Sequence, residues 1–276
     1  MAGLVGLPVM VAGRTLALLN HPRFYDIQEP VGRALMERPD APPGALTPHW
    51  GWMFIVRGQV ERGVEVALSP EMPPDARAQM LGMLTEYQTP LPEAKVDSAL
   101  AADAARGPGP AGFTRAQRAI RAGRPAEAEA AIAGMTRAAE AMRASGDSLM
   151  AARVAAVASI LRGHLAMERG DTETAQSLLE EAFRETGIPI AAMWLARLHA
   201  DQGRPREALR YLETFGPNPW VGLQAGALYE EVGERDKALE AYGWVTLAWD
   251  QADPELQPEV GRAREAIARL RGLQRG

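Results

Sequence analysis

The most constraining feature of this sequence is a short pattern that recurs four times around a glycine. Each copy has an alanine five residues after the glycine and a bulky residue nine residues after it. The glycines are Gly123, Gly170, Gly203 and Gly233, the alanines are Ala128, Ala175, Ala208 and Ala238, and the bulky residues are Ile132, Leu179, Leu212 and Tyr242. Glycine enters the left-handed conformation that ends a helix at low cost, and a small alanine lets two antiparallel helices approach closely. The pattern therefore predicts helical hairpins.

The spacing of the pattern indicates how these hairpins are arranged. Successive glycines are 47, 33 and 30 residues apart. Recurrence at roughly 20–50 residues is typical of helical repeats that stack on one another. The composition agrees, because 47% of the residues are hydrophobic while only 6% are aromatic, and Ala and Leu are strong helix formers. We therefore predict an all-α solenoid of antiparallel helix pairs.

The last copy of the pattern carries more residues of a known repeat. Gly226, Tyr229, Gly233, Ala238 and Tyr242 have the spacing of positions 8, 11, 15, 20 and 24 of a tetratricopeptide repeat, although Gly222 stands where that family has tryptophan. The chain thus resembles the tetratricopeptide repeat family. It is similar to the C-terminal repeat regions of bacterial serine/threonine kinases, adenylate cyclases and transcriptional activators. The resemblance implies a right-handed superhelical solenoid that serves as a non-catalytic arm for binding proteins.

Composition shifts divide the chain into four predicted segments. They are irregular helical hairpins over 1–106, a Gly/Pro linker over 107–112, repeats over 113–249 and a C-terminal capping helix within 250–276. The linker is placed at 107–112 because its alternating glycines and prolines cannot continue a helix. In the first segment we expect a hairpin with its turn at Arg57-Gly58 and a helix that begins near Pro92.

Several classes of function are disfavoured by what the sequence lacks. The formal net charge of −5 argues against a nucleic-acid partner, and the absence of cysteine excludes disulfides and thiolate metal sites. We see no apolar run that approaches a membrane span and no signal peptide, so a cytoplasmic location is expected, with export left open. No phosphate-binding loop, serine nucleophile or metal-spaced histidine pair stands out. We therefore expect no catalytic residues, no cofactor, no metal, no membrane contact and no small-molecule substrate.

The resemblance implies a concave groove lined by the first helix of each repeat. Carrying the family's groove positions onto this chain gives candidate protein-binding residues Ile160, His164, Met167, Glu168, Met193, Arg197, Asp201, Trp220, Leu223, Glu230 and Glu231. Apolar anchors mixed with charges suit a peptide or a helix. The Lys/Asn/Arg set with which chaperone-binding relatives hold a terminal carboxylate is missing. The alternative is that these residues are merely exposed or pack on a neighbouring helix.

A second hypothesis is that the chain assembles with copies of itself. Solenoids have open ends, and head-to-tail contacts that do not close produce filaments. The candidate self-association residues are Leu16, Leu18, Trp50 and Trp52. The C-terminal helix instead carries charges typical of a solvated cap. We favour an adaptor or scaffold that binds a protein or peptide, with homo-oligomers or filaments as the alternative.

Overall fold

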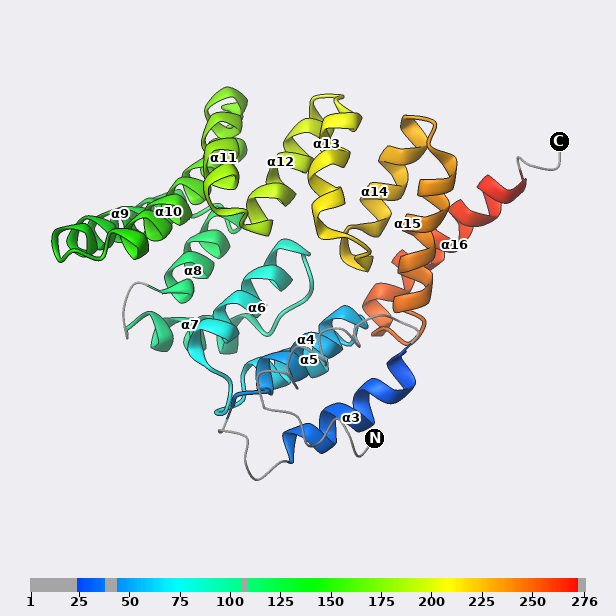
Figure 1. Ribbon diagram of the computed structural model, residues 1–276, viewed down its shortest axis with the longest axis horizontal. Helices are drawn as coiled ribbons and strands as arrows, with labels where there is room; N and C mark the ends of the chain where they lie inside the picture. Colours follow the sequence, from blue (N-terminus) through cyan, green and yellow to red (C-terminus); the bar gives the residue numbers. More distant parts are fainter. Residues whose placement is uncertain (1–23, 38–43, 106–108, 273–276) are drawn as a thin grey trace. The chain divides into compact units, whose positions relative to one another are not determined.

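The structure is a computed structural model that describes residues 24–37, 44–105 and 109–272. All regular secondary structure in these ranges is helical (Figure 1). The α-helices are α3 (Tyr25–Met36), α4 (Thr47–Val56), α5 (Val60–Ala67), α6 (Pro74–Glu86), α7 (Glu93–Ala104), α8 (Pro110–Arg121), α9 (Pro125–Ala144), α10 (Ser148–Glu168), α11 (Thr172–Thr186), α12 (Pro189–Asp201), α13 (Pro205–Leu212), α14 (Pro219–Glu231), α15 (Arg235–Ala248) and α16 (Gln257–Gly272). Two short 3₁₀ helices are η2 (Glu213–Phe215) and η3 (Pro254–Leu256). The all-α prediction is confirmed.

Each of the four recurring glycines ends one helix and opens the turn to the next. Their φ angles are +65° at Gly123, +76° at Gly170, +67° at Gly203 and +79° at Gly233. In the second turn the Gly170 amide donates to the Met167 carbonyl, and the next amide donates to the carbonyl of Ala166. This pair of bonds is the Schellman motif, which satisfies carbonyls left over at the end of a helix. The predicted turn at Gly58 between α4 and α5 has the same bonds, with φ of +72°.

The alanine and the bulky residue of each copy lie where the predicted seam between paired helices requires them. The four alanines are fully buried, and the four bulky residues are at most 5% exposed. The two helices of each hairpin are antiparallel and lie side by side (Figure 1); the pairs are α8 with α9, α10 with α11, α12 with α13, and α14 with α15. The sequence pattern therefore marks the packing core of every hairpin from α8 onward.

Gly226 shows how closely the last pair packs. A Cβ atom built on this residue of α14 would lie 2.5 Å from the ring of Tyr242 on α15. Real side chains do not reach that separation, so the tyrosine ring occupies the space that any larger residue at position 226 would need. A Cβ atom on Gly222, one turn earlier, would lie 2.7 Å from the Val245 side chain and 2.9 Å from the Ala241 carbonyl oxygen.

The chain folds into two compact units. One consists of Met1–Met80 together with Pro217–Gly276, and the other of Leu81–Gly216. We call them the terminal unit and the central unit. These divisions differ from the four predicted segments: residues 106–108 lie outside the described ranges, and Pro110 to Gly112 already belong to α8. Pro110 fits there because the first turn of a helix does not need its missing N–H.

We expected no apolar stretch that approaches the length of a membrane span, but helix α10 of the central unit is long and apolar enough by length and composition alone. Over Ser148–Glu168 its most apolar window has a mean hydropathy of 1.3, and 56% of that window is buried inside the protein. It packs between α9 and α11, which lie on either side of it along the chain. Core helices of helical proteins have the same composition because they are covered on most sides.

Candidate functional site

Four of the predicted groove residues come together on α10 and α12 of the central unit. Nε2 of His164 lies 3.6 Å from Oε1 of Glu168, one turn further along α10. The Arg197 guanidinium of α12 lies 3.7 Å from the same Glu168 oxygen and 3.8 Å from Oδ2 of Asp201. Arg197, Glu168 and Asp201 are partly exposed, whereas His164 is fully buried. Three of the four side chains are therefore accessible to a ligand.

Beneath these side chains is a buried polar cluster formed by Glu86, Gln117, Arg121, His164 and Trp194. The indole N–H of Trp194 donates to Oε2 of Glu86 at 2.6 Å, and Arg121 donates to the same oxygen at 2.7 Å. The Gln117 amide donates to the other Glu86 oxygen and to the Gly82 carbonyl. The His164 ring stacks on the Trp194 indole with centroids 4.0 Å apart. The cluster thus ties together α6, α8, α10 and α12.

Burial and charge act differently on the two titratable groups of this cluster. Burial lowers the pKa of His164 to about 4, against the opposing charge of Glu86, so this histidine is neutral near pH 7. Neither ring nitrogen has a hydrogen-bond partner. For Glu86 burial raises the pKa, but the hydrogen bond from Arg121, the charge interactions with its neighbours and the hydrogen bond from Trp194 together outweigh it and hold the pKa below its usual value. The cluster therefore contains an ionised glutamate, paired with Arg121, next to a neutral histidine.

Sequence reasoning did not find Glu86, Gln117 or Trp194. Glu86 and Trp194 are 108 residues apart and belong to no common motif. Only the apolar residues that surround Glu86 at the end of α6 suggest that it is buried. Such a long-range pair becomes visible only when the helices are placed.

The remaining predicted groove residues of the central unit differ in accessibility. Ile160 is fully buried in the core shared by α8 to α12, so it is not accessible in this conformation. Met167 and Met193 are partly exposed. They flank the charged side chains in sequence, with Met167 next to Glu168 and Met193 one turn before Arg197. The accessible part of the prediction here is Met167, Glu168, Met193, Arg197 and Asp201.

The four predicted groove residues of the terminal unit are engaged differently. The indole N–H of Trp220 donates to the Ile55 carbonyl at 3.0 Å, so this side chain binds a part of its own chain. Glu230 accepts from Arg269 of α16 at 2.9 Å and from the Tyr242 hydroxyl at 2.8 Å, and the Arg269 bond holds its pKa below the usual value. Leu223 is partly exposed and Glu231 is exposed.

Of the candidate self-association residues, the structure describes two. Trp50 and Trp52 on α4 are both partly buried, and the Trp50 ring meets Phe54 edge-on with centroids 5.0 Å apart. Leu16 and Leu18 lie outside the described residues. The self-association hypothesis therefore has structural information only for its α4 part.

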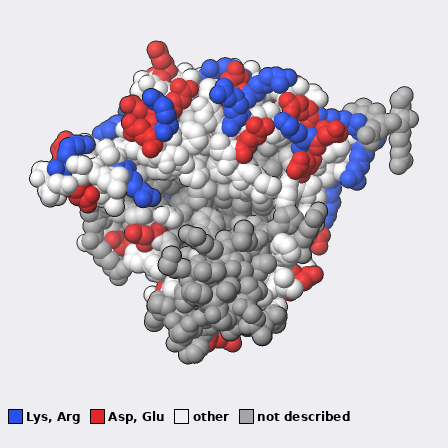
Figure 2. Space-filling model, in the orientation of Figure 1, with Lys and Arg blue, Asp and Glu red and all other residues white. Residues whose placement is uncertain are grey.

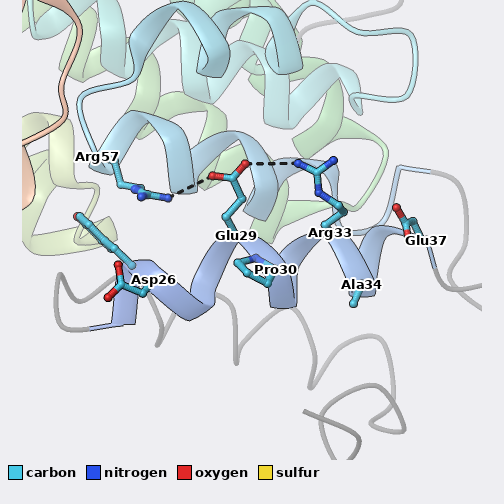
Figure 3. Close-up of a pocket in the computed structure, with 8 residues that line it drawn as sticks. Asp26, Glu29, Pro30, Arg33, Ala34, Glu37 and Arg57 are labelled. Carbon is cyan, nitrogen blue, oxygen red and sulfur yellow. Dashed lines mark hydrogen bonds and ion pairs between the residues drawn. The ribbon is translucent and has the colours of Figure 1, made fainter.

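A pocket of about 580 Å³ lies along α3 in the terminal unit. Figure 3 shows Glu29 between Arg33 and Arg57, at 3.5 Å and 3.7 Å respectively. A hydrogen bond from Arg62, followed by the charges of these arginines, lowers the pKa of Glu29 despite partial burial. The carboxylate therefore stays ionised and paired, which suits a structural ion network better than acid–base chemistry.

On the described parts of the chain, the viewed face carries no patch of a single charge (Figure 2), and the metal-ligating side chains form no metal site. Figure 2 shows acidic and basic side chains intermixed on the viewed face. No group of three or more His, Asp or Glu side chains in the described ranges is arranged to hold a metal ion. What the described surface offers is a mixture of methionines and paired charges on α10 and α12.

Comparisons with known proteins identify the family to which this chain belongs. A family model described as tetratricopeptide repeat-like domain matches residues 113–260. A search of curated proteins gave no match. Among solved structures, a tetratricopeptide repeat protein from Parabacteroides merdae ATCC 43184 is 14% identical, with 93% of this chain and 96% of that chain covered and a TM-score of 0.46. The narrower resemblance to repeat regions of kinases, cyclases and transcriptional activators remains a prediction. Because the family match covers more than half of the 276 residues and spans all four recurring turns, this chain belongs to the tetratricopeptide repeat-like family.

Proposed function

We propose that the chain is a non-enzymatic adaptor that binds a protein segment across α10 and α12 of the central unit. Families of this kind generally provide interaction or scaffold modules. The proposed contact residues are Met167, Glu168, Met193, Arg197 and Asp201, which are the accessible members of the predicted groove in that unit. His164 supports them from below as part of the buried polar cluster.

The observation that carries this proposal is the geometry of Arg197. Its guanidinium lies 3.7–3.8 Å from two carboxylates, which is longer than a normal hydrogen bond, and its side chain is 43% exposed. A ligand carboxylate can therefore form short, bidentate bonds to Arg197 without breaking strong existing ones. The neighbouring methionines offer flexible apolar contact. Together they favour a segment that carries an acidic residue beside an apolar one.

The buried polar cluster contributes by fixing the backbone beneath the contact residues. Hydrogen bonds from Arg121, Gln117 and Trp194 converge on one glutamate and connect α6, α8 and α12, and the His164 ring of α10 stacks on Trp194. A rigid support lowers the entropy lost when a partner binds, so the charges above it act as a preformed recognition surface.

The test is to compare partner recovery by the wild type and two variants. Met193→Asp and Arg197→Glu should each reduce recovery about tenfold or more, because each removes a central contact and adds a repulsive group. Arg210→Glu on α13, another exposed arginine of the central unit, is the matched control and should recover the partner normally. Equal recovery by wild type and Arg197→Glu would exclude α12 as the binding surface.

Self-assembly through open ends is the second candidate. In the terminal unit, part of the N-terminal region is bound to the last repeat of the same chain, which favours the adaptor. Light scattering over about a hundredfold range of concentration separates the two. A constant mass near 29.8 kDa supports the adaptor, and a mass that grows with concentration supports assembly.

A further inference from the structure

The turn between α4 and α5 is held by residues from the other end of the sequence. The indole N–H of Trp220 donates to the Ile55 carbonyl at 3.0 Å, and that of Trp249 donates to the Val56 carbonyl at 3.2 Å. These two carbonyls belong to the last turn of α4, where carbonyls lack partners within the helix. We call Trp220, Trp249 and Asp253 the turn clamp.

Asp253 binds the other side of the same turn. Its backbone N–H donates to the Gly58 carbonyl at 3.0 Å, and its Oδ2 accepts from the Glu61 amide at 2.9 Å. The Glu61 amide lies in the first turn of α5, where amides lack carbonyl partners within the helix. The clamp therefore binds the end of one helix and the beginning of the next, and at the Ile55 carbonyl it adds to the bond already donated by the Gly58 amide.

Gly58 fits the clamp because it has no side chain. A Cβ atom here would lie 2.6 Å from the Ala252 Cβ and 3.0–3.1 Å from Trp249 and Leu256 side-chain atoms. The equivalent glycines of the repeats, Gly123, Gly170, Gly203 and Gly233, have nothing within 4 Å of such an atom. The turns have the same internal hydrogen bonds, but the Gly58 turn is enclosed while these four are open.

The four hydrogen bonds described above, from Trp220, Trp249 and Asp253, each end on the backbone of the turn. Apart from a glycine at its centre, the turn needs no particular side chain for these bonds. Such a surface recognises a shape, namely a helix that ends in a Schellman turn and is followed at once by a second helix.

We infer that the turn clamp is a recognition site for helix–glycine–helix turns, filled by the chain's own α4–α5 turn, and that the same turn of a second copy can replace it. A second copy is the occupant that carries this turn by definition. The contact joins residues 165 to 195 positions apart, so the bonds are the same whether turn and clamp belong to one chain or two. Within one chain the effective concentration of the turn at its own clamp is on the order of millimolar, so the wild type forms this contact intramolecularly.

The experiment uses two full-length variants that fail in complementary ways. Gly58→Ala keeps the clamp but has a turn that clashes with it. Trp249→Phe/Asp253→Ala keeps the turn but lacks one indole donor and the carboxylate, while the phenyl ring preserves most of the packing. In each variant alone, the amide hydrogens of α4 and α5 should exchange with solvent about tenfold faster than in the wild type, and the variant should remain monomeric. Gly170→Ala is the control, because its φ of +76° imposes the same backbone strain in an open turn.

Mixing the two variants should produce a one-to-one complex. The intact turn of one chain then enters the intact clamp of the other, so the mass doubles from 29.8 kDa and the α4–α5 amides of the clamp-deficient chain regain protection. A mixture that keeps the single-chain mass and the fast exchange would overturn the inference. Normal exchange in Gly58→Ala alone would also overturn it, since glycine would then not be required.

If Gly58→Ala does not fold, Glu61→Pro can take its place. Proline is tolerated in the first turn of a helix and removes the amide that binds Asp253. The same mixture should again give a complex, because the clamp of that variant is intact. Failure of this pair to associate would count against the inference as well.

Discussion

The indole N–H of Trp194 on α12 donates a 2.6 Å hydrogen bond to Oε2 of Glu86 at the end of α6, although 108 residues separate the two along the chain. Glu86 is 5% exposed and Trp194 is 1% exposed. A buried carboxylate needs every donor that reaches it, because losing one leaves a charge that water cannot solvate. The stability of the central unit should therefore be sensitive to each partner of Glu86.

Trp194→Phe should lower the free energy of unfolding by about 1–3 kcal/mol, because it removes a donor to a buried charge while keeping most of the ring packing. Urea unfolding of the wild type, Trp194→Phe, Glu86→Gln and the double variant gives the coupling between the two residues. Strictly additive losses would mean that the hydrogen bond contributes nothing.

Arg121→Met should cost about 3 kcal/mol or more, since it leaves the carboxylate of Glu86 without its charged partner. Arg169→Met is the matched control: Arg169 pairs with Glu129, and both side chains are 54% exposed. Its loss should change stability by less than about 1 kcal/mol. Similar urea midpoints for the two variants would contradict the role assigned to burial.

Unfolding should depend on pH through His164. Its pKa is about 4 in the folded protein and 6.5 as the reference for an unfolded chain, so the unfolded state binds the proton more readily. The contribution is complete above pH 6.5 and is lost as the pH falls toward 4, up to about 3 kcal/mol. Below the usual pKa of Glu86, protonation of that carboxylate adds a further loss.

His164→Phe isolates this effect, because phenylalanine can still stack on Trp194 but cannot bind a proton. Between pH 6.5 and 4 the variant should lose less stability than the wild type in urea titrations at fixed ionic strength. Parallel pH profiles for the two proteins would show that another group causes the slope.

Gly226→Ala should destabilise the last repeat by about 2 kcal/mol or more, because the new methyl group meets the Tyr242 ring at 2.5 Å. Gly243→Ala on α15 is the control, since nothing lies within 4 Å of its Cβ position. There the gain in helix propensity should be neutral or stabilising by up to about 1 kcal/mol. Thermal unfolding of both variants, followed by circular dichroism, measures the difference.

The hairpins were predictable because their signals are local. Gly203 and Ala208 are five residues apart, and a turn followed by a close helix contact is encoded within such a distance. The turn at Gly58 was predicted for the same reason. Local pattern therefore identified the helix pairs of the repeats and the turn between α4 and α5.

The candidate site was less predictable, because accessibility depends on contacts between distant segments. Ile160 and His164 occupy groove positions of the family but are covered in the packed central unit. Trp220 occupies another such position, yet it binds the Ile55 carbonyl, 165 residues earlier in the chain. No periodicity in the sequence records which of these positions other parts of the chain will cover.

The clamp on the Gly58 turn also sets an order of events during synthesis. Asp253 leaves the ribosome 195 residues after Gly58, about 10–40 s later at common rates of translation. The intervening hairpins need only their neighbours and can fold in that interval, whereas α4 and α5 must wait with their turn uncovered. Helices α4 and α5 are thus synthesised early but are among the last to form all their contacts. Their turn stays exposed on the nascent chain until the residues of the turn clamp have been synthesised.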